Sequence, residues 1–232
     1  MNPAAQPCVP RLSVVVPALD EAASIATTVS DALVHADEVI VVDGGSRDAT
    51  AALAAAAGAR VVDAPRGRAA QMNAGAALAT GDVLLFLHAD CRLPPLAGDA
   101  VRAAVCAGAR WGRFDVRLDS SRAALAVVGA MMNLRSRLTG IATGDQAIFV
   151  DRSLWSALDG YAPIPLMEDV ELCARLRRMA RCACLRERVT VSARRWETRG
   201  VARTVVEMWA WRAAYALGVS PARLHRLYYG RR

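Results

Sequence analysis

The sequence of 232 residues contains no lysine, few aromatic side chains and no long uninterrupted apolar segment. All 29 residues counted as lysine or arginine are therefore arginines, and the net charge is +7. Arginine favours contact with phosphates or with an anionic membrane surface, although a GC-rich genome would produce the same bias. Because the arginines are scattered and lack interleaved aromatic residues, nucleic acid is not an expected partner.

Segments that direct a chain into or across a membrane are also missing. The longest apolar stretches are shorter than a membrane span and are interrupted by charges. Residues 1–10 are polar and proline-rich, unlike the basic and then apolar start of a cleavable signal peptide. We therefore expect a cytoplasmic protein.

Two kinds of familiar motif are absent as well. The six cysteines show no C-x-x-C spacing, which favours reduced, mostly buried thiols over a zinc site or a disulfide framework. Neither G-x-G-x-x-G nor G-x-x-x-x-G-K-[ST] occurs, so the dinucleotide fingerprint and the phosphate-binding loop are both excluded. The sequence does contain 54% hydrophobic residues, which is enough for the core of one large domain.

Short apolar or β-branched runs alternate with helical patterns in the first part of the chain. The runs predicted to be strands are residues 12–16, 38–43, 60–62 and 83–87. Their alternation with helices predicts an α/β fold with a mostly parallel central sheet flanked by helices. We expect one domain over residues 1–200 and a helical extension over residues 201–232, packed on the domain or at a membrane.

Acidic residues follow two of the predicted strands. Asp43 ends the second strand, and His88-Ala89-Asp90 follows the fourth. The carboxyl ends of strands in an α/β sheet are where a ligand crevice opens, and polar groups there are costly to bury alone. A ligand site at this edge is one interpretation, and a polar strand end that merely turns the chain is the other.

The second half of the sequence adds more carboxylates. Gly144-Asp145-Gln146 precedes a further apolar run, and Glu168-Asp169 begins a predicted helix. Asp169 precedes Cys173 by four residues, so we expect it to share the inward face of that helix, with Glu168 turned away. Such a set of acids suits a transfer site in which one reads a nucleoside, one holds a divalent cation and one serves as a base.

In their order and spacing, these motifs resemble those of the family 2 glycosyltransferases, which have the GT-A nucleotide-sugar-binding fold. The matching stretches are Val14–Glu21, Val41–Asp48, Leu84–Asp90, Gly144–Gln146 and Glu168–Asp169. Residues 192–196 resemble a basic, tryptophan-containing motif found in part of that family. The sequence is most similar to its small bacterial branch, the arsenosugar-biosynthesis-type glycosyltransferases.

The resemblance implies a role for each matching residue. The nucleotide-binding residues would be Pro17, Asp20, Glu21, Asp43, Arg66, Asn73 and His88. Asp90 would hold Mg²⁺ or Mn²⁺ at the diphosphate, and Asp169 would be the general base. The sugar, the acceptor or the leaving diphosphate would meet Gly144, Asp145, Gln146, Glu168, Arg194, Arg195 and Trp196.

Several of these residues also have simpler structural interpretations, which the sequence leaves open. Asp43 could serve only to hold a glycine turn, and Asp145 could be a turn residue as well. Arg195 could be a surface cation, and Trp196 could pack in the core, as most tryptophans do. The acids at helix starts, including Asp169, could act as caps.

His88 departs from the family pattern, in which an Asp-x-Asp motif binds the metal. Imidazole can ligate Mn²⁺ but suits Mg²⁺ poorly. Either Asp90 therefore binds the cation with phosphates and water alone, or His88 assists it.

The function expected from the resemblance is that of an inverting glycosyltransferase. It would move a sugar from a UDP- or GDP-sugar to an acceptor hydroxyl of unknown identity. A sugar-nucleotidyltransferase is one alternative, but residues 17–20 lack the glycine-rich basic loop that it needs. A catalytically silent sugar-nucleotide-binding protein is the other.

The predicted helix 201–217 carries Trp209 and Trp211 beside arginines, which suits peripheral contact with the inner face of a membrane.

Overall fold

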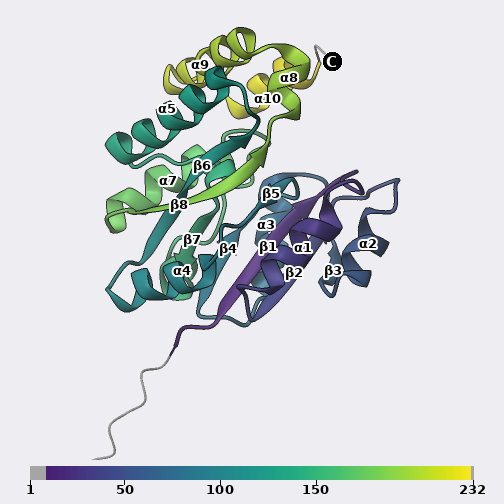
Figure 1. The fold of residues 1–232 in the computed structure, drawn as a ribbon. Helices are drawn as coiled ribbons and strands as arrows, with labels where there is room; N and C mark the ends of the chain where they lie inside the picture. Colours follow the sequence, from purple (N-terminus) through teal and green to yellow (C-terminus); the bar gives the residue numbers. More distant parts are fainter. Residues whose placement is uncertain (1–8, 231–232) are drawn as a thin grey trace, which may run out of the picture.

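A computed structural model describes residues 9–230 of the chain (Figure 1). Residues 1–8, with Cys8 and most of the polar start, lie outside the described residues, as do residues 231–232. The strands are β1 (Leu12–Ala18), β2 (Glu38–Asp43), β3 (Arg60–Asp63), β4 (Val83–Phe86), β5 (Cys91–Arg92), β6 (Trp111–Asp119), β7 (Ile148–Asp151) and β8 (Ala183–Ser192). The α-helices are α1 (Ile25–Leu33), α2 (Thr50–Ala56), α3 (Arg68–Leu78), α4 (Ala97–Cys106), α5 (Ala123–Thr139), α6 (Arg152–Ala157), α7 (Glu168–Met179), α8 (Arg194–Arg199), α9 (Val201–Ala216) and α10 (Pro221–Tyr229), and a short 3₁₀ helix, η1, spans Gly144–Gln146.

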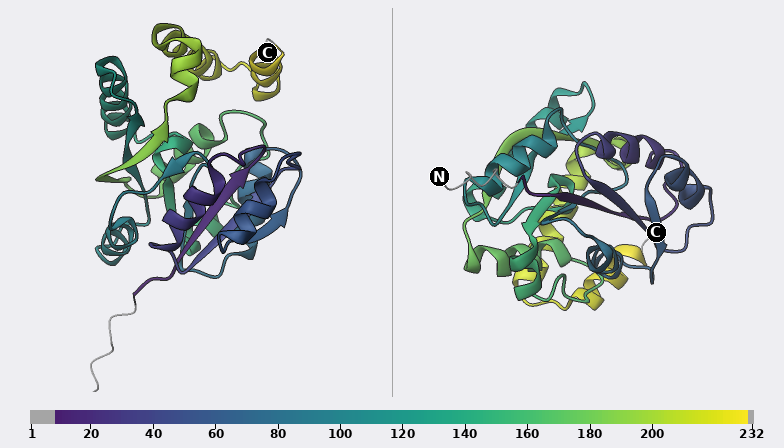
Figure 2. Two further views of the ribbon diagram at one scale, coloured as in Figure 1. Left: turned by 45° about the vertical axis from the view of Figure 1, so that its right-hand side comes forward. Right: turned by 90° about the horizontal axis from the view of Figure 1, so that it is seen from below.

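The strands form one sheet in the order β3-β2-β1-β4-β7-β6-β8-β5. Neighbouring strands run parallel from β3 to β4 and again between β6 and β8. The pairings of β7 with β4 and β6, and of β5 with β8, are antiparallel. The sequence-based prediction of an α/β fold with a mostly parallel sheet and flanking helices is therefore confirmed, as Figures 1 and 2 show.

In the first half of the sheet, β2, β1 and β4 are buried on both faces, whereas β3 lies at the edge and is half-buried or exposed. Every residue of β1 is buried, and alternate side chains belong to two separate apolar clusters. Val14 packs in the cluster that includes α1 and α2, whereas Val15 packs in the cluster that includes α3. Helix α3 lies so close to the sheet that a Cβ atom added to Gly75 would approach Val15 Cγ1 to 2.4 Å. These helices fix the carboxyl ends of the parallel strands at one edge.

The second half of the sheet is assembled from segments distant in sequence. Residues of β6 pair with β7 on one side and with β8 on the other, so β6 lies inside the sheet. At the end of this half, Cys91 of β5 pairs with Val191 of β8. The main-chain N–H of Ser192 also donates a hydrogen bond to the carbonyl of Asp90, at 3.3 Å. The last strand therefore lies against the loop that follows β4.

The C-terminal helices gather with α5 at the end of the molecule drawn uppermost in Figure 1. Gly200 separates α8 from α9. Val205 and Met208 of α9 pack against the core, while Val206 and Trp209 are exposed. Within residues 9–230, no helix is both long enough and apolar enough to cross a membrane. The boundary predicted at residue 200 coincides with this glycine, and the division into two parts stays a prediction.

Candidate active site

The ends of β1 and β2 are joined by a network of side-chain hydrogen bonds to the main chain. The buried Asp43 carboxylate accepts hydrogen bonds from the main-chain N–H groups of Gly45 (3.1 Å) and Ser46 (2.9 Å), and it also pairs with the Ser46 hydroxyl. Asp20 accepts one from the N–H of Arg47, at 2.8 Å. The turn-holding role left open for Asp43 is thus present in the structure, and contact of either acid with a nucleotide stays a prediction.

Two amide side chains near these strand ends are committed to the main chain. Gln71 on α3 donates to the carbonyls of Ala18 and Val42, each at 2.8 Å, and so holds the ends of β1 and β2 together. Asn73 donates to the carbonyl of Tyr161 and accepts from its N–H, at 2.8 and 2.9 Å. Asn73 therefore positions the 161 loop, and the nucleotide contact predicted for it stays a prediction.

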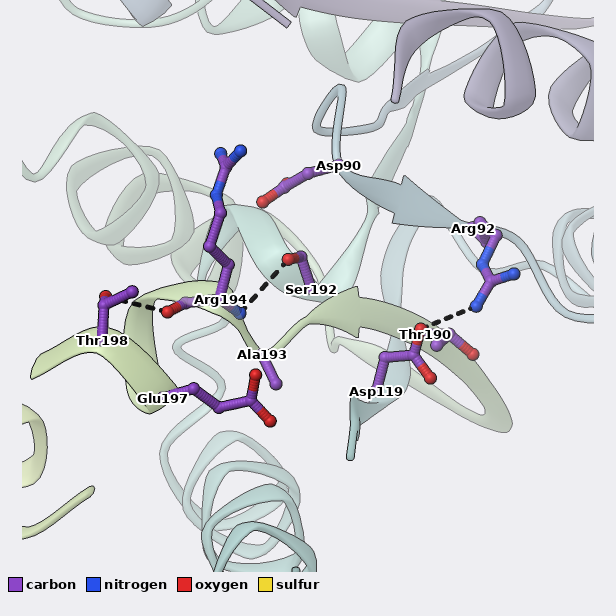
Figure 3. A pocket seen from close by; sticks show the side chains of 9 residues that line it. All are labelled: Asp90, Arg92, Asp119, Thr190, Ser192, Ala193, Arg194, Glu197 and Thr198. Carbon is purple, nitrogen blue, oxygen red and sulfur yellow. Dashed lines mark hydrogen bonds and ion pairs between the residues drawn. The ribbon is translucent and has the colours of Figure 1, made fainter. Parts of the chain in front are cut away.

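Beside Asp90 lies a cavity of about 280 Å³ (Figure 3). Asp90 and Arg194 are among the residues that line it, and in Figure 3 the carboxylate of Asp90 points toward the Arg194 side chain. Arg194 Nη2 lies 3.7 Å from an oxygen of Glu21. Burial, followed by the negative charge of Asp90, raises the pKa of Glu21, and the charge of Arg194 acts in the opposite direction. Residues from the ends of β1, β4 and β8 therefore share one electrostatic environment.

The residues around Asp90 fit a hard divalent cation. Within the described part of the chain, ligand atoms of His88, Asp90 and Cys91 lie within 4.8 Å of one another. Burial raises the pKa of the Cys91 thiol well above its usual range, so the thiol stays protonated and is a poor ligand. An Asp90 oxygen and phosphate oxygens suit Mg²⁺ or Mn²⁺, and an imidazole nitrogen suits Mn²⁺.

His88 is packed against the turn that η1 forms. Its Nδ1 lies 3.2 Å from Asp145 Oδ1. A Cβ atom added to Gly144 would lie 2.2 Å from His88 Nε2, so a side chain at that position would displace the ring. Burial would raise the pKa of Asp145, but the hydrogen bond and charge of His88, with the charges of Arg68 and Arg195, lower it. Asp145 is therefore held as a carboxylate at the end of β4.

The same turn contacts the start of α7. The main-chain N–H of Gly144 donates to Asp169 Oδ2 at 3.0 Å, and that of Val170 donates to Asp169 Oδ1 at 2.7 Å. His88, Asp145, Gly144 and Asp169 thus form one continuous set of contacts. It connects the loop after β4, which carries Asp90, with α7, a helix about 80 residues further along the chain.

Glu168 is buried, and the prediction that it turns away from the interior is wrong. Glu168 precedes Leu172 by four residues, just as Asp169 precedes Cys173, so both acids lie on the buried side of α7. The nearest cation is Arg68 of α3, whose Nη1 lies 3.9 Å from Glu168 Oε1. Burial, followed by the charge of Asp169, raises the pKa of Glu168.

Two further site residues predicted from the sequence are structural. Gln146 is fully buried, and its Nε2 donates to Ser136 Oγ of α5 at 3.0 Å. It holds η1 against α5, and its predicted contact with a sugar or acceptor stays a prediction. Trp196 is only 6% exposed and packs in the apolar core, and its predicted contact with the leaving diphosphate or acceptor also stays a prediction. The hydrogen bond of Gln146 and the burial of Trp196 both result from helix packing, which the sequence motifs do not encode.

The remaining predicted residues differ in exposure. Arg66 and Arg194 are exposed, whereas Pro17 is buried within β1. Arg195 is half-buried, and its guanidinium lies 5.4 Å from the centre of the Tyr228 ring. The sequence motifs missed Arg68 and Arg135, and the only signal for them was that arginine is the sole strong base in this chain.

The fold is the GT-A fold of nucleotide-sugar transferases, and solved structures share it. Glucosyl-3-phosphoglycerate synthase from Mycobacterium tuberculosis, in complex with Mg²⁺ and uridine diphosphate, is 25% identical with a TM-score of 0.57, over 78% of this chain and 70% of that one. A mannosyltransferase from Pyrobaculum calidifontis, in complex with GDP-Man and Mn²⁺, is 21% identical with a TM-score of 0.57, over 78% of this chain and 56% of that one. A mycobacterial protein is 23% identical with a TM-score of 0.55, over 79% of this chain and 65% of that one. This chain therefore spans between 56% and 70% of the length of these three structures.

A family model also matches part of the chain. Residues 13–124, just under half of the chain, match the family described as Glycosyl transferase family 2. No curated protein sequence matches the chain. The matched segment ends before η1 and α7, and the arguments for Asp145 and Asp169 therefore rest on the structure.

Proposed function

We propose that the protein transfers a sugar from a UDP- or GDP-sugar to an acceptor hydroxyl, with inversion at the anomeric carbon. The set of contacts that runs from His88 through Asp145 and Gly144 to Asp169 carries this proposal. It brings a carboxylate that can act as a base to the strand end that holds Asp90. Support also comes from similar structures in complex with uridine diphosphate and Mg²⁺, or GDP-Man and Mn²⁺.

In this proposal Asp90 holds the divalent cation, which when bound offsets the charge of the leaving diphosphate. Arg194, exposed beside Asp90, adds a second positive charge on the same side. The nucleotide lies over the carboxyl ends of β1, β2 and β4, near Asp20, Glu21 and Asp43.

Asp169 is the proposed general base. Each carboxylate oxygen accepts one main-chain hydrogen bond and keeps a further lone pair for the acceptor hydroxyl. As that hydroxyl attacks, its oxygen bonds to the anomeric carbon, its proton moves to Asp169, and the bond to the diphosphate breaks. Attack from the face opposite the diphosphate inverts the anomeric centre.

Two finer parts of the proposal concern relatives and location. We place the protein in the arsenosugar-biosynthesis-type branch on the resemblance of its motifs. We also propose a cytoplasmic location with peripheral membrane contact through α9, where Val206 is 67% and Trp209 is 65% exposed beside arginines. Weaker sedimentation of Trp209→Ala with anionic liposomes tests this contact, and unchanged sedimentation contradicts it.

The decisive experiment measures donor binding and turnover separately. A thermal-shift panel of UDP-, GDP- and dTDP-sugars with Mn²⁺ identifies the donor, because a ligand that binds the folded state raises the melting temperature. Release of nucleoside diphosphate is then measured with and without candidate acceptors. Asp90→Asn should abolish the metal-dependent shift, while Asp99→Asn, an exposed carboxylate on α4, should retain it. If both variants keep the shift, or if both lose it, the proposed placement of the metal is wrong.

A further inference from the structure

Arg135 on α5 is a half-buried cation that forms no ion pair with any of residues 9–230. Its Nε and Nη2 atoms are inaccessible to solvent and have no hydrogen-bond partner among residues 9–230. Most buried guanidinium groups are paired, because burial of an unpaired charge is costly. Burial, followed by the positive charge of Arg212, lowers the pKa of Arg135 to about 10. The group is therefore held where an anion would stabilise it.

The surrounding contacts place Arg135 next to the proposed base. The neighbouring residue, Ser136, accepts the hydrogen bond from Gln146 of η1, and the first residue of η1 donates to Asp169. The charge of Asp169 acts on the pKa of Arg135 as well. Helix α5 therefore borders η1, the element that contacts both His88 and Asp169.

Two more arginines face the same region. Arg212 of α9 is half-buried, and no hydrogen bond or ion pair joins its side chain to the described residues. The charges of Arg212 and Arg135 both counter the burial that raises the pKa of the Cys173 thiol to about 12. Arg195 Nε is another buried nitrogen without a hydrogen-bond partner among residues 9–230, and the charge of Arg195 contributes to lowering the pKa of Asp145.

The acids nearby act on these arginines through their charge but form no ion pair with them within residues 9–230. Asp145 is paired with His88, and Asp169 accepts hydrogen bonds from two main-chain N–H groups. Three guanidinium groups from α5, α8 and α9 are thus left without a direct carboxylate partner. Forked guanidinium donors match phosphate and carboxylate oxygens closely.

We propose that Arg135, together with Arg195 and Arg212, binds an anionic group of the acceptor, a phosphate or a carboxylate. This inference rests on the proposed function, because it assigns the acceptor to the Asp169 side of η1 and the donor diphosphate to the Asp90 side. The acceptor is then a hydroxylated molecule that carries at least one negative charge, and a neutral sugar or alcohol is a poor substrate.

The test uses inorganic phosphate and acetate as probes of the full chain saturated with Mg²⁺ and the nucleoside diphosphate selected by the panel above. Saturation occupies the donor diphosphate site, so any anion that still binds does so elsewhere. We expect phosphate or acetate to bind the wild type, and Arg135→Gln to weaken that binding roughly 10- to 100-fold, as expected for a hydrogen bond between charged groups. Arg178, an exposed arginine of α7 with no hydrogen bond or ion pair to residues 9–230, provides the matched control, and Arg178→Gln should leave binding unchanged. The stronger of the two probes identifies the anionic group.

A parallel kinetic arm compares glycerol with glycerol phosphate and glycerate as acceptors. Arg135→Gln should raise KM for an anionic acceptor and leave the KM for the donor unchanged. If Arg135→Gln does not fold, Arg212→Gln takes its place in both arms. The inference is overturned if neither anion binds the nucleotide-loaded wild type, if the variant binds as well as the wild type, or if the nucleoside diphosphate displaces the anion. Because nucleotide binding is measured without acceptor, failure of this inference and failure of the proposed function give different results.

Discussion

Substitution of Asp169 by asparagine separates proton transfer from structure at the proposed base. The carboxylate accepts hydrogen bonds from the N–H groups of Gly144 (3.0 Å) and Val170 (2.7 Å). An asparagine oxygen can replace only one of these acceptors, and the amide NH₂ cannot accept from the second N–H. The variant therefore loses basicity and one half-buried hydrogen bond at once.

The two effects have different sizes and different observables. Loss of general-base catalysis should lower kcat by about 10²–10⁴, which corresponds to about 2.7–5.4 kcal/mol. The unmatched N–H should cost about 1–3 kcal/mol of stability, a decrease of several degrees in Tm for a chain of this size. Nucleoside diphosphate release at saturating donor and acceptor measures the first effect, and a thermal melt measures the second.

Glu168→Gln is the matched comparison, since Glu168 lies one residue away on the same buried helix start. It should weaken the contact with Arg68 and retain most turnover, because Glu168 is not the residue bound to η1. Donor binding should persist in both variants. Turnover of Asp169→Asn within a few-fold of wild type, or a larger loss in Glu168→Gln, would refute the assignment of the base.

Three other predictions follow from contacts outside the catalytic centre. Gly75→Ala should lower the free energy of unfolding by about 1–3 kcal/mol in urea melts, because its Cβ has no room against the sheet; an unchanged midpoint contradicts that packing. Burial would raise the pKa of Asp151, but hydrogen bonds from an arginine, a serine and the start of α6 lower it. Asp151→Asn should therefore lower the free energy of unfolding at pH 7 by about 1 kcal/mol. That difference should vanish as pH falls through the folded-state pKa, below about 4, and a pH-independent difference argues against the pairing. The hydrogen bond shared with Cys182, followed by nearby arginine charges, lowers the pKa of Cys184. Iodoacetamide should therefore modify Cys184 faster at pH 7 than the exposed Cys106, as peptide mass spectrometry can determine, and equal rates would contradict the shift.

The strands of the first half were predictable because their environment is uniform. Residues of β1, β2 and β4 are buried on both faces, so each appears in the sequence as a continuous apolar run ended by a turn or an acid. The positions of Asp43 and Asp90 at strand ends follow from the same pattern. This local information was sufficient to predict the fold class.

The roles of polar side chains were harder to predict, because long-range packing decides them. Gln146, Asn73 and Trp196 have the residue types that bind ligands, but their partners are α5, the 161 loop and the core. Arg135 belongs to no recognised motif, and its lack of a partner appears only when α5 is placed against η1. The sequence indicates which residues can bind, and the tertiary structure decides whether they bind a ligand or the chain itself.

The pairing of β8 with β5 has a consequence for how the protein is made. The loop that carries Asp90 is held by Ser192, a residue synthesised about 100 positions later. Contacts of such long sequence separation form late, because a large loop must close first. A nascent or truncated chain that contains only the family-matched segment would therefore lack the strand that fixes the carboxylate proposed to bind the metal. Donor chemistry would begin only after nearly the whole chain has emerged and folded.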